Sequence, residues 1–342
     1  MLSRTRTPRA LVLLTVLAVG TLGLTAPVEA QPAPAHTERT VAAKKAKDPR
    51  RTRGLFVDRL MPAAKQGGVY RTRIGTKSQA FWVIPEAYPT GQVRSKVRAY
   101  TKRALAAKKT PVITVYGIPG RDCGSHSSGN PITTAAQYRK WIAQISLALR
   151  KQRAIVILEP DALPLFSSPV TTCATKPAGW QAMLRYASKT LTRSGAWVYL
   201  DAGHSNWTPY DTRAAALKSA GIAYARGFST NVSNFRSTTA EKKYAAVLLK
   251  GLSRLKVRGK HYVIDTSRNG AKPSADGNDV INPRWARVGK APRLVFRGAF
   301  DGTLWVKHPG ESDGPVNDGP SSGRWCDRLA DRLLSRVDSG RC

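Results

Sequence analysis

The sequence predicts a single α/β domain built as a distorted parallel β/α barrel of about seven strands. From Gly54 onward, short and fully apolar segments alternate with longer amphipathic segments, as in a parallel sheet covered by helices. About seven such units favour a closed or nearly closed barrel. No Gly-x-Gly-x-x-Gly motif follows the first apolar segment, which argues against a dinucleotide-binding fold.

The expected strands are the apolar segments at 80–84, 111–118, 154–160, 196–203, 224–230, 261–267 and 303–307. The first five intervals between them contain the expected helices, at 91–109, 135–152, 178–195, 212–221 and 240–255. In a parallel barrel the loops after the strands form the functional face. Residues that directly follow each apolar segment are therefore the candidates for a site.

The amino-terminal residues are expected to lie outside this domain. Residues 1–30 begin with a basic stretch, continue with an apolar run and end in small residues near Ala30, which is typical of a secretory signal peptide. The apolar run is shorter than the roughly 20 residues of a membrane span, although an anchor is the alternative. Residues 31–53 are expected to form a disordered basic linker. We therefore expect a secreted protein with one folded domain at 54–342 and no membrane association after cleavage.

The net charge of +35 predicts attraction to polyanions. For an exported protein, anionic cell-wall polymers and acidic polysaccharides are the expected partners. Lys and Arg are spread along the whole chain rather than gathered in one motif, so we expect no nucleic-acid partner. A basic surface that only keeps the protein soluble is the alternative.

The four cysteines are expected in an oxidising compartment, which permits disulfides. They are Cys123, Cys173, Cys326 and Cys342. Spacing alone does not choose among the three possible pairings. Because no Cys-x-x-Cys pair is present, we expect no metal site.

Carboxylates recur just after the expected strands. They are Asp122, Asp161, Asp201, Asp265, Glu311 and Asp313. One such Asp is usually a helix cap or a turn residue, but several on one rim imply a metal site or paired acid–base chemistry. Trp82, Tyr116 and Trp207 lie in or just beyond the strands, and aromatic faces beside carboxylates suit a sugar. Trp305, inside an apolar run, is expected in the core.

Six motifs, in this order, resemble those of glycoside hydrolase family 6, the endoglucanases and cellobiohydrolases that act on cellulose. They are YGIPGRDCGSHSSG, VILEPDAL, YLDAGHSNW, GFSTNVSNF, IDTSRNG and LWVKHPGESDG. The resemblance runs from about Gly54 to Gly314. It implies a distorted β/α barrel that hydrolyses β-1,4-glucan with inversion of the anomeric configuration. We expect a monomer that needs no cofactor.

An inverting hydrolase needs one acid and one base, about 6.5–9.5 Å apart. The resemblance implies that Asp161 is the acid, and its pKa must then be raised by burial or a neighbouring carboxylate. Asp122 is implied as that neighbour. Asp313 matches the proposed base, with water activated directly or through a relay.

The resemblance also implies residues that bind the substrate. They are Trp82, Tyr116, Asp201, His204, Trp207, Asn231, Asn234, Lys307 and Glu311. Tyr116 matches the tyrosine beneath the sugar at the cleavage point, and Trp82 and Trp207 match stacking platforms. Asp201 is expected to order the site by hydrogen bonding. Arg268 is a further polar candidate, and it and the two asparagines are equally compatible with structural roles.

The chain departs from the family late in the barrel. The family often has Trp-Cys-Asn-Pro where this chain has Val-Ile-Asn-Pro at 280–283, so one stacking aromatic and one disulfide are missing. Cys326 then pairs with Cys342, or either remains free. We predict a bridge between Cys123 and Cys173, because it ties the loop that carries Asp122 to the segment that trails Asp161.

The intervals after the strands leave little room for long loops, which favours an open cleft and endo action. The competing hypothesis is a glycan-binding protein that keeps the fold and has lost turnover. A basic nucleic-acid binder is a third hypothesis, disfavoured by the spread of the charge.

Overall fold

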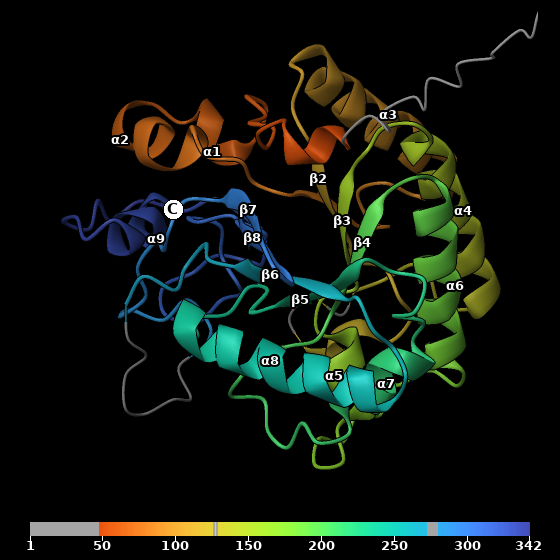
Figure 1. The fold of residues 1–342 in the computed structure, drawn as a ribbon. Helices are drawn as coiled ribbons and strands as arrows, with labels where there is room; N and C mark the ends of the chain where they lie inside the picture. The colour runs from red at the N-terminus through yellow and green to blue at the C-terminus, as the bar shows by residue number, and fades with distance from the viewer. Residues whose placement is uncertain (1–47, 126, 128, 272–279) are drawn as a thin grey trace, which may run out of the picture. The chain divides into compact units, whose positions relative to one another are not determined.

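The computed structural model describes residues 48–125, 127, 129–271 and 280–342. Its centre is an eight-stranded sheet in the order β1-β2-β3-β4-β5-β6-β8-β7, shown in Figure 1. The strands are β1 (Phe81–Val83), β2 (Val112–Val115), β3 (Ile155–Leu158), β4 (Trp197–Asp201), β5 (Gly227–Thr230), β6 (His261–Asp265), β7 (Arg293–Arg297) and β8 (Phe300–Leu304). All are parallel except β7, which is antiparallel to β8. The predicted distorted α/β barrel is confirmed.

Helices lie along the outside of the sheet (Figure 1). They are α1 (Pro62–Lys65), α2 (Gly68–Tyr70), α3 (Thr90–Ala106), α4 (Ala135–Leu149), α5 (Ala162–Ser167), α6 (Trp180–Arg193), α7 (Arg213–Ser219), α8 (Thr238–Arg254) and α9 (Asp327–Leu333). The five predicted helices correspond to α3, α4, α6, α7 and α8. Helix α4 begins at a capping box in which Thr134 and Gln137 cap each other's backbone, so both amides are satisfied where the helix starts.

Alternate side chains of the parallel strands enter two different cores. Ile113, Val156 and Val198 pack among the residues of the outer helices. Their neighbours Val112, Ile155 and Tyr199 pack in a second, smaller cluster. Because successive side chains of a strand point to opposite faces, both faces of the sheet are buried. This is why the strands read as continuous apolar runs rather than alternating ones.

The last part of the sheet differs from the prediction. The final strand was expected at 303–307 and instead covers Phe300–Leu304, and β7 was not predicted. Trp305 lies in the core, 3% exposed, as expected. In β8, Asp301 is fully buried and accepts hydrogen bonds from Arg226 at 2.5 Å and from the Tyr199 hydroxyl at 2.5 Å. A charged residue so paired does not interrupt a strand.

The two ends of the parallel sheet meet through a few contacts rather than a strand ladder. The backbone N–H of Ala80 donates to the carbonyl of Trp305 at 3.0 Å. The Trp82 indole donates to the carbonyl of Val306 at 2.7 Å, and the His308 ring lies 2.6 Å from the carbonyl of Ala80. These contacts form a seam between β1 and the segment after β8, and they close the distorted barrel.

The ordered body begins before the predicted boundary at residue 54. A short 3₁₀ helix, η1, covers Pro49–Arg51. Arg50 is only 3% exposed, and its guanidinium donates to the carbonyls of Ala154 and Gly195 at 3.1 and 3.0 Å. The disorder expected for 31–53 therefore does not extend to Asp48–Arg53. The expected signal peptide and residues 31–47 lie outside the described residues. Within the described ranges, no helix has the length and apolarity of a membrane span.

Both disulfides are formed. Cys123 is bonded to Cys173, with Cα atoms 5.0 Å apart, as predicted. Gly120 permits the close approach of the segment that carries Cys173. The φ of Gly120 is +70°, and a Cβ at this position would lie 1.9 Å from the carbonyl oxygen of Thr175. Cys326 is bonded to Cys342, which decides between the two alternatives left open for that pair.

Replacing both Cys123 and Cys173 by serine is expected to lower the free energy of unfolding by about 4 kcal/mol, because this bridge closes a loop of 50 residues in the unfolded chain. The matched control replaces Cys326 and Cys342, which are 16 residues apart, and should cost about 3 kcal/mol. Chemical denaturation of the two double variants measures the difference. A larger loss from the second pair would contradict the loop-entropy argument.

Candidate active site

Four aspartates from four separate segments surround one point at the carboxyl ends of the strands. Asp122 lies in the 3₁₀ segment η3 (Arg121–Gly124) after β2, Asp161 precedes α5 after β3, Asp201 ends β4, and Asp313 follows β8. The charges of the other three all act on the carboxyl of Asp161. The parallel topology thus brings together residues separated by up to 191 positions in the chain.

Among these four aspartates, Asp161 has the surroundings that stabilise the charged form of its carboxyl least. Burial, followed by repulsion from Asp201, Asp122 and Asp313, raises the pKa of the Asp161 carboxyl well above its ordinary value. Among the described residues, no cation or hydrogen-bond donor contacts this carboxyl. The backbone N–H of Asp161 donates to Asp201 Oδ2 at 3.0 Å, and this hydrogen bond holds the backbone of Asp161 in position. Asp161 therefore keeps its proton at pH values where an ordinary aspartate has lost it.

The backbone around this aspartate is held in uncommon conformations. Asp161, Glu159, Asp122 and Cys123 all have φ between +49° and +65°. Such values cost roughly 1–3 kcal/mol in non-glycine residues and persist only where the surroundings enforce them. Here a disulfide and several buried hydrogen bonds do so, and the cluster of strained residues coincides with the cluster of carboxylates.

Tyr116 links the second strand to this group. Its hydroxyl donates a short hydrogen bond to Asp122 Oδ1. Burial, then the charges of Asp122 and Asp161, raises the pKa of the Tyr116 hydroxyl. The phenol therefore stays neutral and acts as a donor that holds the Asp122 carboxylate in position.

Asp201 is almost completely buried and serves the backbone around it. It accepts hydrogen bonds from the N–H groups of Asp161 and Gly203 at 3.0 and 3.1 Å and from the Ser229 hydroxyl at 3.1 Å. Burial raises the pKa of its carboxyl to about 7, although these hydrogen bonds act in the opposite direction. Asp201 thus joins the loops after β3 and β4 to strand β5.

Asp313 has the opposite electrostatic environment. Arg268 Nη1 lies 2.6 Å from one of its oxygens and Lys307 Nζ lies 3.0 Å from the other. Burial opposes the charged form, but these two cations outweigh it and lower the pKa of Asp313 to about 2. Asp313 is thus ionised throughout the usual pH range, while the pKa of Asp161 on the same rim is shifted in the opposite direction.

A second acidic residue on the same loop is held by a histidine. The His308 ring donates from Nδ1 to Glu311 at 2.8 Å and from Nε2 to the carbonyl of Ala80 at 2.6 Å. Burial opposes a charged ring, but Glu311 outweighs it and raises the pKa of His308. Glu311 is therefore anchored through His308 to the seam of the barrel.

The aromatic candidates Trp82 and Trp207 each contact another candidate of the site. Trp82 is partly exposed and meets Tyr116 edge to face, with ring centroids 5.4 Å apart. Trp207 is partly exposed and lies 5.3 Å from the His204 ring. Burial, then repulsion from Arg236 and Arg213, lowers the pKa of His204 to about 3, so this ring is neutral and offers polar nitrogen atoms without charge.

The two asparagine candidates have different surroundings. Asn231 is fully buried; its side chain donates to the carbonyl of Asp265 at 2.8 Å and accepts from the N–H of Arg236 at 2.9 Å. Both ends of its amide are used inside the protein, which assigns it a structural role rather than a sugar contact. Asn234 is partly exposed and donates to the carbonyl of Val232 at 3.1 Å.

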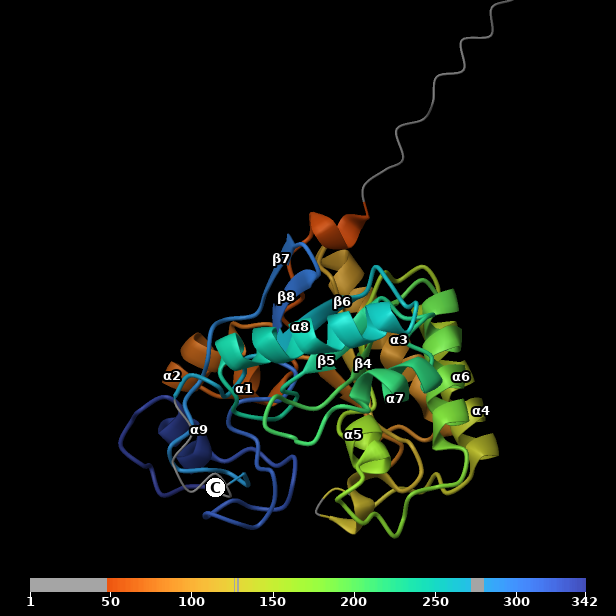
Figure 2. The ribbon, with the colours of Figure 1, turned by 60° about the horizontal axis from the view of Figure 1, so that its bottom comes forward.

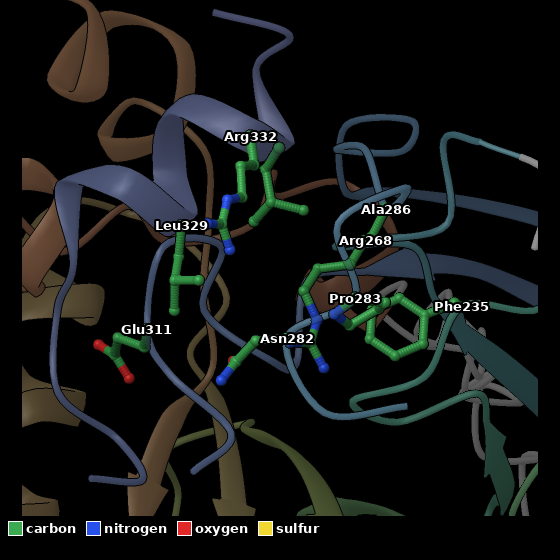
Figure 3. A pocket seen from close by; sticks show the side chains of 9 residues that line it. Phe235, Arg268, Asn282, Pro283, Ala286, Glu311, Leu329 and Arg332 are labelled. Atoms are coloured by element: carbon green, nitrogen blue, oxygen red, sulfur yellow. The ribbon is translucent and has the colours of Figure 1, made fainter. Parts of the chain in front are cut away.

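A small pocket lies beside Asp313, and Arg268, which pairs with this aspartate, is among its lining residues. Figure 3 shows Arg268 and Asn282 between Phe235 on one side and Leu329 on the other. The remaining lining residues are Pro283, Ala286, Glu311, Arg332 and Leu333. Two of these lining residues, Asn282 and Pro283, come directly after Val280 and Ile281, which stand where the family often has Trp-Cys. Val280 is 41% exposed. Among the described residues, no group of three or more His, Cys, Asp or Glu could hold a metal ion.

The sequence of residues 60–337 matches the model of the glycosyl hydrolases family 6. The chain belongs to this family. It is 38% identical to Endoglucanase A of Cellulomonas fimi over 292 residues, which cover 82% of this chain and 61% of the relative. It is 37% identical to Endoglucanase 1 of a Streptomyces species over 262 residues, or 76% of this chain and 70% of the relative.

The family 6 fold is also found by comparison of structures. The endoglucanase Cel6 of Mycobacterium tuberculosis, solved with a methyl-cellobiosyl-thio-cellobioside, matches with a TM-score of 0.75 and 38% identity, over 84% of this chain and 98% of that one. Among the curated relatives, however, this chain spans only 61% of the Cellulomonas fimi enzyme and 53% of Endoglucanase A of Thermobispora bispora.

Two buried carboxylates that support this family 6 site were not selected from the sequence. Asp265 was noted only as one of the carboxylates on the rim; it accepts backbone hydrogen bonds from Ser233, Ser267 and Lys307 at 2.8–3.1 Å and so joins three loops. Glu159 was missed altogether. Its position next to Pro160 at a strand end resembles an ordinary turn, and only the structure shows that it is buried.

Glu159 anchors the loop that leads to Asp122. Its Oε2 accepts from the N–H groups of Gly117 and Ile118 at 2.9 and 3.0 Å, and its Oε1 accepts from the Tyr138 hydroxyl at 2.9 Å. Burial raises the pKa of Glu159 to about 7, although these hydrogen bonds oppose the shift. The neutral form can satisfy the same partners, because its own hydroxyl can donate to Tyr138.

This raised pKa predicts a specific pH dependence of stability. A carboxyl whose pKa is higher in the folded state stabilises the fold fully below its ordinary value of 4.5, and this contribution is lost as the pH rises through about 7. Glu159→Gln mimics the neutral form, so the variant should lose less stability than the wild type between pH 4.5 and 7, by at most about 3 kcal/mol. Urea unfolding at several pH values measures this difference. Parallel curves for the two proteins would contradict the assignment.

Proposed function

We propose that this family 6 member hydrolyses β-1,4-glucosidic bonds of cellulose or a related β-glucan by an inverting mechanism with endo action. The observation that carries the proposal is the pair of opposite environments on one rim. The carboxyl of Asp161 is buried beside three other carboxyl groups, which raises its pKa, whereas Asp313 is paired with Arg268 and Lys307, which lower its pKa. Environments that separate the pKa values of two carboxyl groups are the mark of an acid and a base. The family match and the relatives named endoglucanases support the same activity.

In the proposed reaction, Asp161 donates its proton to the glycosidic oxygen while the bond from that oxygen to the anomeric carbon breaks. A water molecule attacks the anomeric carbon from the opposite face and releases a proton to the solvent or to a base. Asp161 takes up one proton after the reaction, so the cycle consumes no net proton. Asp122, held in position by Tyr116, is proposed to stabilise the positive charge that develops on the sugar ring. This arrangement needs no cofactor.

The route of the water proton follows from the environment of Asp313. Its pKa of about 2 makes it a weak proton acceptor, because Arg268 and Lys307 already stabilise its charge. We therefore favour a relay in which Asp313 orients a chain of water molecules over direct removal of the proton by its carboxylate. This refines the role of base that the sequence assigns to Asp313.

The remaining polar and aromatic candidates are proposed as substrate contacts. Trp82 and Trp207 offer partly exposed rings, suited to the apolar faces of glucose units. Lys307 and Glu311 are anchored to Asp313 and His308, so their positions are preset for sugar hydroxyls. His204 and Asn234 are further candidates at the same rim, whereas Asn231 is not proposed as a contact.

The location and assembly of the protein are also proposals. We propose that residues 1–30 direct secretion and are removed, that 31–47 form a basic linker, and that the folded domain acts outside the cell as a monomer. The two disulfides support an oxidising compartment. We also propose that anionic cell-wall polymers are attracted to its basic surface.

Asp161→Asn should reduce the rate of hydrolysis of a soluble β-glucan by ~10²–10⁴-fold, because the amide cannot supply the acid proton. Binding of cello-oligosaccharides should be retained, and a substrate with a good leaving group should be affected less. Asp211→Asn is the matched control, since Asp211 is exposed and should leave the rate unchanged. If the Asp161 variant keeps more than half of the wild-type rate, the assignment of the acid is wrong. If the wild type itself releases no reducing ends, the protein is a glycan binder without turnover.

Endo action predicts that the viscosity of a soluble cellulose derivative falls early, before much sugar is released. Short segments after the strands and the valine at the expected tryptophan position both favour an open cleft that accepts internal bonds. The measurement follows viscosity and reducing ends in one reaction. Dominant release of cellobiose from the first minutes, with viscosity maintained, would show that the cleft is enclosed.

A further inference from the structure

Asp313 lies where two segments that are distant in the chain meet. One is the segment 280–283, which precedes β7, and the other is the segment 312–317, which follows β8. Figures 1 and 2 both show the lighter blue chain before β7 beside the darker blue chain after β8. Neither disulfide joins these two segments, so noncovalent contacts hold them together.

The side-chain amide of Asn282 bonds to residues before, at and after Asp313. Its Oδ1 accepts a hydrogen bond from the N–H of Asp313 at 2.8 Å. Its Nδ2 donates to the carbonyls of Gly314 and Val316 at 2.8 and 2.9 Å, with Ser312 Oγ 3.2 Å away. Because one planar amide meets all of these partners, it fixes the path of the backbone through Asp313.

Asn282 also contacts the carboxylate itself. Its backbone N–H donates to Asp313 Oδ2 at 3.2 Å, the oxygen that also pairs with Arg268, while Lys307 pairs with Oδ1. The two cations lower the pKa of Asp313. Of these three partners, Asn282 is the one that bonds to the backbone of Asp313 as well as to its carboxylate. The cations thus keep the carboxylate ionised, and Asn282 holds it in place.

The conformation of residue 282 suits an asparagine. Its φ is +48°, a left-handed value that asparagine adopts more readily than most other non-glycine residues. Asn282 is 5% exposed, and a Cβ at Gly319 would lie 2.1 Å from its Nδ2, so the backbone closes over the amide. A buried amide with both ends bonded is a rigid link. Glycine would keep this backbone conformation and lose the link.

Packing supports the segment 280–283 only in part. Asn282 and Pro283 line the small pocket beside Asp313, and Figure 3 shows Asn282 between Glu311 and Arg268. Side chains that border a pocket have fewer packing partners on that side. The hydrogen bonds of Asn282 therefore carry more of the positioning here than they would in a close-packed core.

We propose that Asn282 is a positioning residue of the reaction, which holds the Asp313 carboxylate at the place from which it orients the attacking water. The inference rests on the proposed hydrolysis, because Asp313 has this task only in that reaction. Without the amide, Arg268 and Lys307 still stabilise the charge of Asp313, but its oxygen atoms are no longer kept in one place. The loss therefore falls on the chemical step rather than on substrate binding.

The test variant is Asn282→Gly, because glycine adopts the left-handed conformation without strain and the change removes only the side-chain amide. The kcat for cellohexaose should fall by about 10- to 100-fold, since small displacements of a group that orients a reactant have effects of this size. The KM and the affinity for the oligosaccharide should stay within about twofold of the wild type. A dinitrophenyl β-cellobioside should lose a similar factor, because a good leaving group replaces the acid but not an oriented water.

The control variant is Lys256→Gly, which replaces another left-handed residue, exposed at the end of α8 that leads into β6. It should leave kcat unchanged. A double-mutant cycle then separates positioning from a general effect on the structure. In a protein that carries Asp313→Ala, the further change Asn282→Gly should lower kcat by less than about twofold, because the group through which Asn282 acts is absent. Thermal unfolding verifies that each variant is folded.

The inference is wrong if Asn282→Gly keeps more than half of the wild-type kcat, if it raises KM instead, or if it costs the same factor with and without Asp313. These outcomes leave the proposed hydrolysis intact, because the wild type still turns over. A wild type that hydrolyses neither substrate would overturn the proposed function, and this inference with it.

Discussion

Four carboxylates meet at the carboxyl ends of parallel strands, and the repulsion among them has to be relieved for the barrel to fold. Three are relieved by partners: Asp313 by two cations, Asp201 by three hydrogen bonds, and Asp122 by the hydroxyl of Tyr116. Asp161 has no such partner among the described residues, so burial and this repulsion raise its pKa well above the ordinary value. The chemistry proposed for the site is thus a direct result of how the fold distributes stabilising contacts among chemically identical side chains.

The parts of the fold that were predicted are those whose burial is uniform. Strands β2, β3 and β5 are buried along their whole length, and β4 and β6 are buried everywhere except at their first residue. These strands appear in the sequence as largely apolar runs. Strand β7 has a partly exposed, charged pattern, from Arg293 to Arg297, which no run of apolar residues marks. The start of β8 contains Asp301 and Gly302, residues typical of a turn, and only the tertiary pairing with Arg226 makes this aspartate compatible with a strand.

The site shows the same limit. The ordered motifs located the aspartates, because their positions after the strands can be counted along the chain. The sequence did not distinguish residues that face the cleft from those that hold it together. Asn231 lies in one of the motifs of the site, yet its side-chain amide forms hydrogen bonds with backbone groups of the protein. Glu159 lies next to a proline, yet it anchors the loop before Asp122. Those differences depend on distances between segments, which no single sequence displays.

The seam between β1 and the segment after β8 has a mechanical consequence. Hydrogen-bonded ladders join the neighbouring parallel strands, whereas only isolated contacts join β1 to the segment after β8. We expect the barrel to deform first at this seam. Trp82 stands on one side of the joint, and Lys307, Glu311 and Asp313 follow on the other. Their separation can change by bending of the few contacts of Ala80, Trp82 and His308, while the ladders between the other parallel strands stay intact. The seam, held by these few contacts, is therefore the joint of the barrel at which the two sides of the site can move most easily relative to each other.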